Sequence, residues 1–348
     1  MNNSGNYSDL LSICIPTYNR DYLIQKCLQR ICPIAQKYGV KIYVSDNASP
    51  DQTESVIREL QQQYDNLVYI RQKETIAPDD NFEFILKAPD TRYRWLLADG
   101  TYFYDESLSF LLSELESQEW DLYIAAYDER DLTETPVIYT DPEKLLQECG
   151  WKLTWISHLI FHQKIIENGN FQRFRDSHFI HTGVIFEYFA FHSCRVKTDR
   201  RVQANVFDEP KRGHWQHVVF DIFCKDWFLF VLSLPVRYSW EAKRQCAKMH
   251  GKRSKIFTYQ NLIHLRHHHY WNTKTLSRYR FFIQQTIEIP FFMLWMLSAF
   301  FPVYYLFYRF YVIFFLYIIG RGILHPVKTI KHLIHKNSSQ AMRWKDTK

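Results

Sequence analysis

The fold is decided by residues 11–20, LSICIPTYNR, a short apolar run that ends in a polar turn. Residues 12–15 suit a strand covered on both faces, because strands buried between helices read as nearly continuous apolar runs. Pro16 has no N–H to donate to a sheet, so it fits the end of such a strand. The sequence therefore predicts a buried strand whose last residues are exposed at one edge of a sheet.

A helix is expected directly behind this turn. Apolar residues recur at helical spacing from Leu23 to Ile31, and Asn19 or Asp21 is the expected cap. Pro33 is expected to interrupt the helix, since proline removes a backbone hydrogen bond from a helix interior.

The same pattern then repeats. Residues 41–44 predict a second strand, which runs into the polar turn SDNASPD at residues 45–51. A second helix is expected to begin there with Pro50 at its first position, and residues 67–70 predict a third strand. Units of this βαβ type collect polar side chains at the carboxyl ends of their strands, where α/β sheets bind ligands.

A third strand end carries a lone acid. Residues 94–102, RWLLADGTY, form an apolar strand that ends at Asp99. Taken in order, the Pro-x-Tyr-Asn-Arg turn at residues 16–20, the Val-x-Asp-x-x-Ser-x-Asp pattern at residues 44–51 and Asp99 resemble the family 2 glycosyltransferases. The similarity extends to the bacterial surface-polysaccharide type, which includes abequosyltransferases, and is strongest over residues 9–125.

This resemblance implies an α/β fold of the GT-A class, with a Rossmann-like βαβ start and a mixed, mostly parallel sheet. We expect the GT-A domain at residues 1–236 and a helical, membrane-associating region at residues 237–348. By resemblance, Asp46 hydrogen-bonds the base, typically uracil, so a UDP-sugar is the expected donor. The expected donor-binding residues are Pro16, Thr17, Tyr18, Asn19, Arg20, Asp46, Asn47, Ser49, Asn81 and Asp99.

The acidic motif departs from the family pattern. Members usually carry a second or third acid after the first Asp, whereas this chain has Gly100 and Thr101. Magnesium is usually bound by one or two carboxylates together with substrate phosphates, so Asp99 is the expected ligand for Mg²⁺ or Mn²⁺. In the alternative, Asp99 contacts only the ribose, and a cationic side chain such as Arg71 or Lys73 neutralises the diphosphate.

The acceptor side has weaker signals. Trp155 and His158 are expected in the acceptor wall, since sugar C–H faces stack on aromatic rings; core packing is the alternative. Many family members place a Glu-Asp pair near the start of a later helix, where the Asp is the catalytic base, and this chain lacks that pair. A histidine is a natural base near neutral pH. We expect His181 as the base, followed by Asp176 and His178, with a hydrogen-bonded helix histidine as the alternative.

The two parts of the chain have opposite charge. Residues 1–236 carry a net formal charge of −10 and residues 237–348 one of +16. Within the basic part, residues 290–320 hold a single charge, Arg309, and many aromatic side chains. Three interpretations compete: in-plane or hairpin helices at a membrane surface, one transmembrane span over residues 290–308, or a soluble core or dimer face. We favour the first, with anionic lipid rather than nucleic acid as the partner.

Composition also indicates the cellular compartment. Seven cysteines without a CxxC pair suggest reduced thiols, and the polar residues 1–9 lack the apolar region of a signal peptide. We therefore expect the cytoplasmic face of the membrane, in a peripheral or monotopic position. The histidines of residues 261–269 do not predict a metal site, because consecutive side chains on a helix point in different directions and no Cys or acid lies nearby.

The expected function is an inverting transfer of one sugar from a nucleotide-diphosphate sugar to a glycan acceptor, expected to be lipid-linked, in surface polysaccharide biosynthesis. An inactive GT-A domain that binds nucleotide-sugars as a membrane scaffold is the main alternative. A processive synthase is disfavoured because such enzymes usually carry several clear membrane spans. A nucleotidyltransferase is disfavoured because residues 16–20 contain no glycine.

Overall fold

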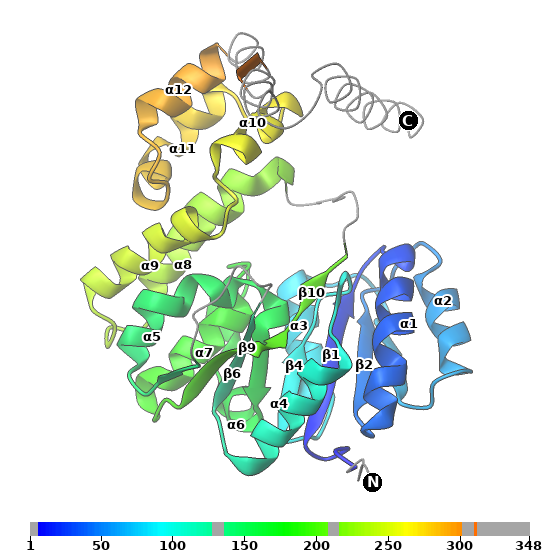
Figure 1. The fold of residues 1–348 in the computed structure, drawn as a ribbon. Coiled ribbons are helices and arrows are strands. Elements are labelled where there is room, and N and C mark those ends of the chain that lie inside the picture. The colour runs from blue at the N-terminus through cyan, green and yellow to red at the C-terminus, as the bar shows by residue number, and fades with distance from the viewer. Residues whose placement is uncertain (1–5, 127–135, 208–215, 301–309, 312–348) are drawn as a thin grey trace, which may run out of the picture. The chain divides into compact units, whose positions relative to one another are not determined.

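A computed structural model describes residues 6–126, 136–207, 216–300 and 310–311 (Figure 1). These residues form two compact units. The first runs to Phe257 and includes Tyr279–Glu288, and the second comprises Thr258–Arg278 and the described residues from Ile289 onward. The candidate site described below lies within the first unit.

One eight-stranded sheet organises the first unit, with the strand order β3-β2-β1-β4-β8-β6-β9-β7. Strand β1 pairs in parallel with β2 and β4, and β2 pairs in parallel with β3, whereas β8 is antiparallel to both of its neighbours. The sheet is therefore mixed and mostly parallel around β1, as the sequence predicts. The strands are β1 (Leu11–Thr17), β2 (Lys41–Asp46), β3 (Leu67–Arg71), β4 (Tyr93–Leu96), β6 (Leu122–Ala126), β7 (Val137–Tyr139), β8 (Leu159–His162) and β9 (Val196–Gln203).

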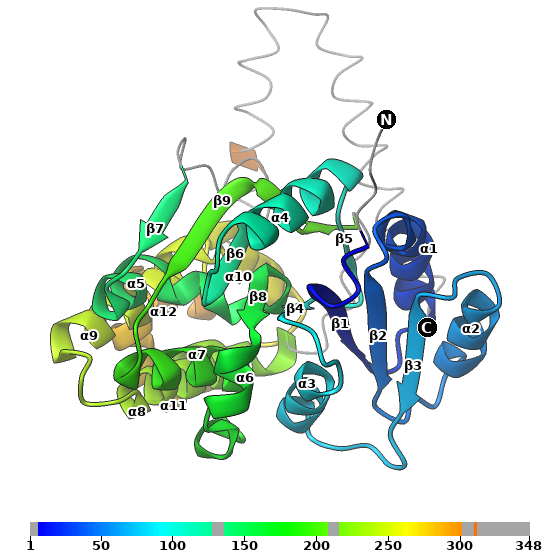
Figure 2. The same cartoon turned by 90° about the horizontal axis from the view of Figure 1, so that it is seen from below.

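Helices cover both faces of this sheet (Figure 2). On one face, α1 and α4 bury their apolar sides together with the odd-numbered residues of β1, such as Ile13 and Ile15. On the other face, α3, α6 and α7 pack with Cys14 and with β8. The helices are α1 (Asp21–Lys37), α2 (Thr53–Gln61), α3 (Pro78–Lys87), α4 (Asp105–Ser117), α5 (Pro142–Cys149), α6 (Gln163–Asn168), α7 (Ile180–Phe191), α8 (Trp227–Ser233), α9 (Trp240–Arg253), α10 (Tyr259–His267), α11 (Thr273–Thr286) and α12 (Phe291–Ala299).

Three local helix predictions are wrong. Helix α1 continues through Pro33 to Lys37, and its N-cap is Arg20, without a side-chain capping bond, rather than Asn19 or Asp21. Residues on both sides of the proline, Cys32 and Ala35, are fully buried, so burial of the apolar face offsets the lost hydrogen bond. Helix α2 begins at Thr53 and not at Pro50.

The reason for the later start of α2 is a side-chain hydrogen bond. The carboxylate of Asp51 accepts from the backbone N–H of Thr53 at 3.1 Å and from its hydroxyl at 2.6 Å. This closes a short turn ahead of the helix, as aspartate side chains often do. Pro50 therefore lies in the loop.

The C-terminal part is described only to residue 311. Helix α9 packs on α5 within the first unit, so the compact units divide at residue 257, while the domain boundary expected at residue 236 stays a prediction. Among the residues that the structure describes, no helix has the length and hydropathy needed to cross a bilayer. Most of the apolar segment at residues 290–320 lies outside the described residues.

Candidate active site

Three strand ends meet at one edge of the sheet. Thr17 ends β1 and is paired in register with Asp46, which ends β2, while Asp99 follows β4 on the other side of β1. The Thr17 hydroxyl donates to Asp99 Oδ2 at 2.9 Å, and Arg20 Nη1 lies 3.3 Å from Asp99 Oδ1. The turn at residues 16–20, the first of the three motifs, is therefore in direct contact with Asp99, the third.

Hydrogen bonds also connect the end of the first motif, at residues 16–20, with the second motif, at residues 44–51. The backbone N–H of Asn19 donates to Ser49 Oγ at 2.8 Å, and the N–H of Asp21 donates to Asp51 at 3.0 Å. Asn19 has a φ of 54°, in the left-handed region that asparagine tolerates better than most residues. This conformation turns the chain out of β1 and towards the turn after β2. Tyr18, at the tip, is 44% exposed.

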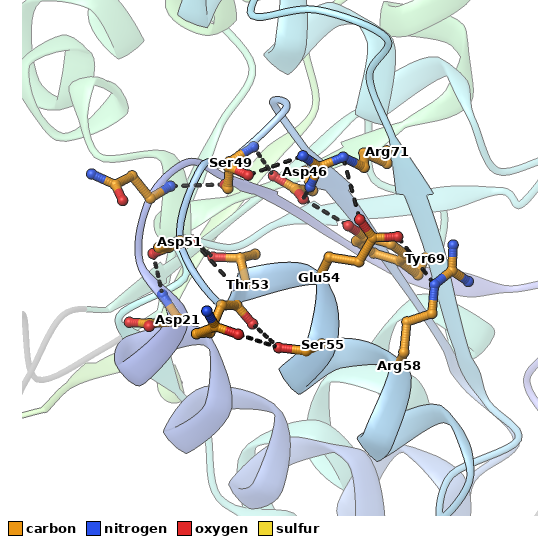
Figure 3. A network of polar contacts seen from close by, with 12 residues as sticks. Asp21, Asp46, Ser49, Asp51, Thr53, Glu54, Ser55, Arg58, Tyr69 and Arg71 are labelled. Atoms are coloured by element: carbon orange, nitrogen blue, oxygen red, sulfur yellow. Dashed lines mark hydrogen bonds and ion pairs between the residues drawn. The ribbon is translucent and has the colours of Figure 1, made fainter.

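Asp46 is the centre of a polar network (Figure 3). Its fully buried carboxylate accepts from the Ser49 N–H at 2.9 Å, from the Tyr69 hydroxyl at 2.6 Å and from Arg71 Nη1 at 2.7 Å. Burial raises the pKa of Tyr69, and the hydrogen bond to Asp46 raises it further. Arg71 also donates to the Ser49 carbonyl at 3.0 Å. The network thus fixes the turn after β2 and uses Arg71 as the counter-ion of Asp46.

Helix α3 begins beside this network. The Asn81 amide oxygen accepts from the Ser45 hydroxyl at 2.6 Å, next to Asp46 in the chain. Asn47 exchanges two hydrogen bonds of 2.9 Å with the backbone of Ile76, just before the helix. Asn47 and Asn81 therefore lie near the other residues expected to bind the sugar donor. In this structure, both hold neighbouring segments together through hydrogen bonds.

The turn at Asp99 is closed by its own backbone and by Ser157. The Thr101 hydroxyl donates to the Ala98 carbonyl at 2.6 Å and lies 3.2 Å from Ser157 Oγ, which also accepts from the Ala98 N–H at 2.9 Å. The Thr101 hydroxyl therefore stabilises the turn through these two contacts. The described residues contain no group of three or more His, Cys, Asp or Glu side chains that could hold a metal ion. A divalent cation at Asp99 fits this donor set when substrate phosphates and water supply the remaining ligands.

The expected acceptor residues lie on the segment that supports this turn. Trp155 stacks on His158 with ring centroids 5.5 Å apart, on either side of Ser157 in the chain. The Ser157 carbonyl accepts from the Trp95 indole N–H at 2.8 Å. Strand β4 therefore positions the segment with Trp155 and His158 next to the Asp99 turn.

His181 is in the first turn of α7 and only 2% exposed. Its Nε2 lies 3.3 Å from the Thr154 carbonyl, and since a carbonyl only accepts, the hydrogen is on Nε2. Burial lowers the pKa of His181 to about 4. His181 is therefore a neutral imidazole at neutral pH, and it ties α7 to the acceptor segment.

His178 occupies a different environment. Its imidazole is 47% exposed, with Nδ1 3.2 Å from Asp226 Oδ2, and its backbone N–H donates to Asp79 Oδ2 at 3.3 Å. Burial raises the pKa of Asp79 to about 6. Asp176 and His178 have φ values of 61° and 66°. Asp79 and Asp226 are absent from the sequence-based candidates, because no pattern relates two acids so far apart in the chain.

The comparisons with known proteins agree with this geometry. The model of the family described as "Glycosyl transferase family 2" matches residues 12–198. The chain belongs to glycosyl transferase family 2. The matched residues contain the three strand-end motifs, the acceptor segment and helix α7.

One curated relative is the abequosyltransferase RfbV of Salmonella typhimurium. The two sequences are 33% identical over 118 residues, which is 33% of this chain and 35% of the relative. The match thus spans about a third of each protein.

Solved structures support the GT-A-like fold. The Staphylococcus aureus protein TarS (residues 1–349), in complex with UDP-GlcNAc, aligns with a TM-score of 0.54 at 14% identity, covering 80% of this chain and 81% of TarS. Its complex with UDP aligns with a TM-score of 0.51 at 12% identity, covering 79% of each chain. The likeness extends beyond the part matched by the family model.

Proposed function

We propose that this protein transfers one sugar from a nucleoside-diphosphate sugar to a glycan acceptor, with inversion at the anomeric carbon, in surface polysaccharide biosynthesis. The observation that carries the proposal is the contact of Asp99 with Thr17 and Arg20. It brings the lone acid of the third motif against the turn of the first motif, at the carboxyl ends of adjacent parallel strands. Ligands bind at this edge in α/β sheets.

In this proposal, the turn of residues 16–20 and the network around Asp46 form the base side of the donor pocket. Asn47, Ser49 and Asn81 hold that network in place through the bonds described above. Arg71 is about one-third exposed and offers N–H groups at the same position. The carbonyl oxygens of a uracil base can accept from this guanidinium, which the buried Asp46 carboxylate holds in place, so a UDP-sugar is the donor we propose.

Asp99 would hold the divalent cation. A bound Mg²⁺ or Mn²⁺ supplies positive charge to the departing diphosphate. Among this chain's own residues, Arg20 adds a guanidinium next to Asp99, which orients the carboxylate and contributes positive charge. Thr17 fixes the other carboxylate oxygen.

The acceptor is proposed to be lipid-linked and to lie against Trp155, which stacks on the buried His158. Support for a membrane position comes from the second unit, where α12 and the residue after it expose Phe292 (67%), Trp295 (43%) and Phe300 (47%). Exposed aromatic side chains in a basic segment favour the interface of an anionic membrane. This proposal places the protein on the cytoplasmic face of the membrane, where a lipid-linked acceptor is within reach.

A thermal-shift screen of nucleotides and nucleotide-sugars tests the donor proposal. A ligand present at 100 times its Kd stabilises the folded protein by about 2.7 kcal/mol. We expect UDP and at least one UDP-sugar to raise the Tm and Arg20→Ala to reduce that rise. Release of nucleoside diphosphate then separates an enzyme from a scaffold, which would bind the donor without turning it over. A screen without any stabilising nucleotide-sugar would contradict the proposal.

A further inference from the structure

A cluster of charged side chains surrounds the turn before α7, and the donor pocket described above does not include it. Asp226 Oδ2 lies 3.2 Å from His178 Nδ1, and Asp226 Oδ1 lies 3.2 Å from Lys225 Nζ. Asp79, at the start of α3, accepts the backbone N–H of His178. Two carboxylates from distant parts of the chain thus converge on one histidine.

We propose that His178 is the general base of the transfer and that Asp226 is the positioning residue that orients its imidazole. The proposal rests on the proposed sugar transfer and adds to it the group that removes the acceptor proton. His181, the base expected from the sequence, is nearly fully buried and already donates from Nε2 to a backbone carbonyl. His178 is half-exposed, and within the described part of the chain its Nε2 has no hydrogen-bond partner.

The tautomer follows from the contact with Asp226. A carboxylate next to Nδ1 keeps the hydrogen on that nitrogen, so Nε2 carries the lone pair that can accept a proton. The same carboxylate stabilises the imidazolium once it forms. An imidazole held by a carboxylate on one side and open on the other has the arrangement that a general base requires.

The backbone around His178 is unusual on both sides of the contact. His178 and Asp176 adopt left-handed φ values, which cost free energy for residues with a Cβ atom and cluster at functional sites. Asp226 ends a π-helical segment, Asp221–Asp226, a form that is rare and frequently found at functional sites. These features keep the side chains of His178 and Asp226 within reach of each other.

The position of the turn relative to the donor pocket follows from α3 and α7. Helix α3 contacts Ser45 through Asn81 and His178 through Asp79, two residues earlier. Arg175 pairs with Asp80 and Glu83 of α3, at 3.1 and 2.9 Å, and so fixes the turn on the same helix. The turn with His178 therefore lies at the end of α3 that faces the Asp46 network.

In the proposed step, His178 Nε2 takes the proton of the acceptor hydroxyl while the acceptor oxygen forms a bond to the anomeric carbon. The bond between that carbon and the diphosphate oxygen breaks, and its electron pair leaves with the nucleoside diphosphate. The imidazolium then releases its proton to solvent. With water as acceptor, the same base supports slow hydrolysis of the donor, which is measurable without the natural acceptor.

The test compares His178→Asn, Asp226→Asn and His192→Asn in the full chain, using the UDP-sugar selected by the thermal-shift screen. Asparagine tolerates the left-handed φ of residue 178, so the turn is retained. His192, at the other end of α7, stacks on Tyr188 and serves as the matched control. We expect His178→Asn to lower kcat for nucleotide release roughly 100-fold or more, with the Kd of UDP within about twofold of wild type.

The comparison of kcat with the Kd of UDP separates positioning from a merely structural role. The Asp226 carboxylate holds the His178 ring through Nδ1. Asp226→Asn is therefore expected to lower kcat while the Kd of UDP stays within about twofold of wild type.

The outcomes are distinguishable. A kcat for His178→Asn within about twofold of wild type would overturn the base assignment while leaving the donor site intact. A wild-type kcat in Asp226→Asn, or a loss of kcat matched by an equal weakening of UDP binding, would overturn its positioning role. If the wild-type protein binds no nucleotide-sugar, the proposed function itself fails, whatever the variants do.

Discussion

Asp46→Asn tests the network at the end of β2. Its fully buried carboxylate accepts from Ser49, Tyr69 and Arg71 at 2.6–2.9 Å. An amide at this position keeps one acceptor oxygen but turns an NH₂ group, itself a donor, towards donors. Hydrogen bonds to charged groups contribute about 1.5–3 kcal/mol each. Because Arg71 is about one-third exposed, water compensates part of its loss, so we expect a loss of about 2 kcal/mol.

Thermal melting provides the measurement. For a domain of this size, 1 kcal/mol corresponds to roughly 2–4 °C, so Asp46→Asn should lower the Tm by about 4–8 °C. Asp65→Asn, on the exposed loop before β3, is the matched control and should melt like the wild type. The stabilisation by UDP should also disappear in Asp46→Asn. A Tm equal to that of the control would refute the structural role of the network.

Three further predictions concern other parts of the molecule. Burial raises the pKa of Asp79 from its usual 3.8 to about 6, so the fold loses stability as the pH rises from about 4 to 6 and does not regain it at higher pH. Asp79→Asn should therefore be more stable than wild type by about 2 kcal/mol at pH 7.5 in urea unfolding, with the gain vanishing near pH 4; an equal gain at both pH values would exclude this cause. The double variant Phe292→Ser/Trp295→Ser should sediment less with anionic vesicles than the control Phe191→Ser, which changes an exposed aromatic of the first unit. Equal sedimentation of the wild type, the double variant and the control would argue against α12 as a membrane contact. Chelation should abolish nucleotide release, and Mn²⁺ or Mg²⁺ should restore it; full activity in the chelator would leave Arg20 as the neutralising group.

The strands and their polar turns are predictable because their causes are local. Residues 11–15 form a strand since all but Ser12 are apolar, and Pro16 lies near its end for lack of an N–H. The family resemblance then relates Asp46 and Asp99 to one site. The structure places both acids at one edge, in contact with the turn after β1 either directly or through Ser49.

What the sequence did not predict depends on tertiary contacts. Helix α1 passes through Pro33 because burial of Cys32 and Ala35 outweighs a local preference. The contact of His178 with Asp226 requires α3, α7 and the π-helical segment to be packed first, and no periodicity encodes that packing. The burial of His181 is equally invisible in a one-dimensional pattern, since its neighbours Ile180 and Val184 suit either a core or a site wall.

The arrangement suggests how a family 2 fold can work with a reduced acidic motif. Gly100 and Thr101 leave Asp99 as the single carboxylate of the motif, while Arg20 provides a cation from the first turn. His178 would in the same way stand in for the missing Glu-Asp pair. If both proposals hold, the charge requirements of sugar transfer are kept and only the residues that meet them differ.

Nucleotide release by the wild type and by Asp99→Ala, with the UDP-sugar selected in the screen, tests the central claim most directly. The matched control is Asp105→Ala, whose exposed carboxylate pairs with Lys37 on the surface. The account predicts a loss of roughly 100-fold or more for Asp99→Ala and wild-type turnover for Asp105→Ala. Undiminished turnover by Asp99→Ala would contradict the assignment of this strand end to the donor diphosphate.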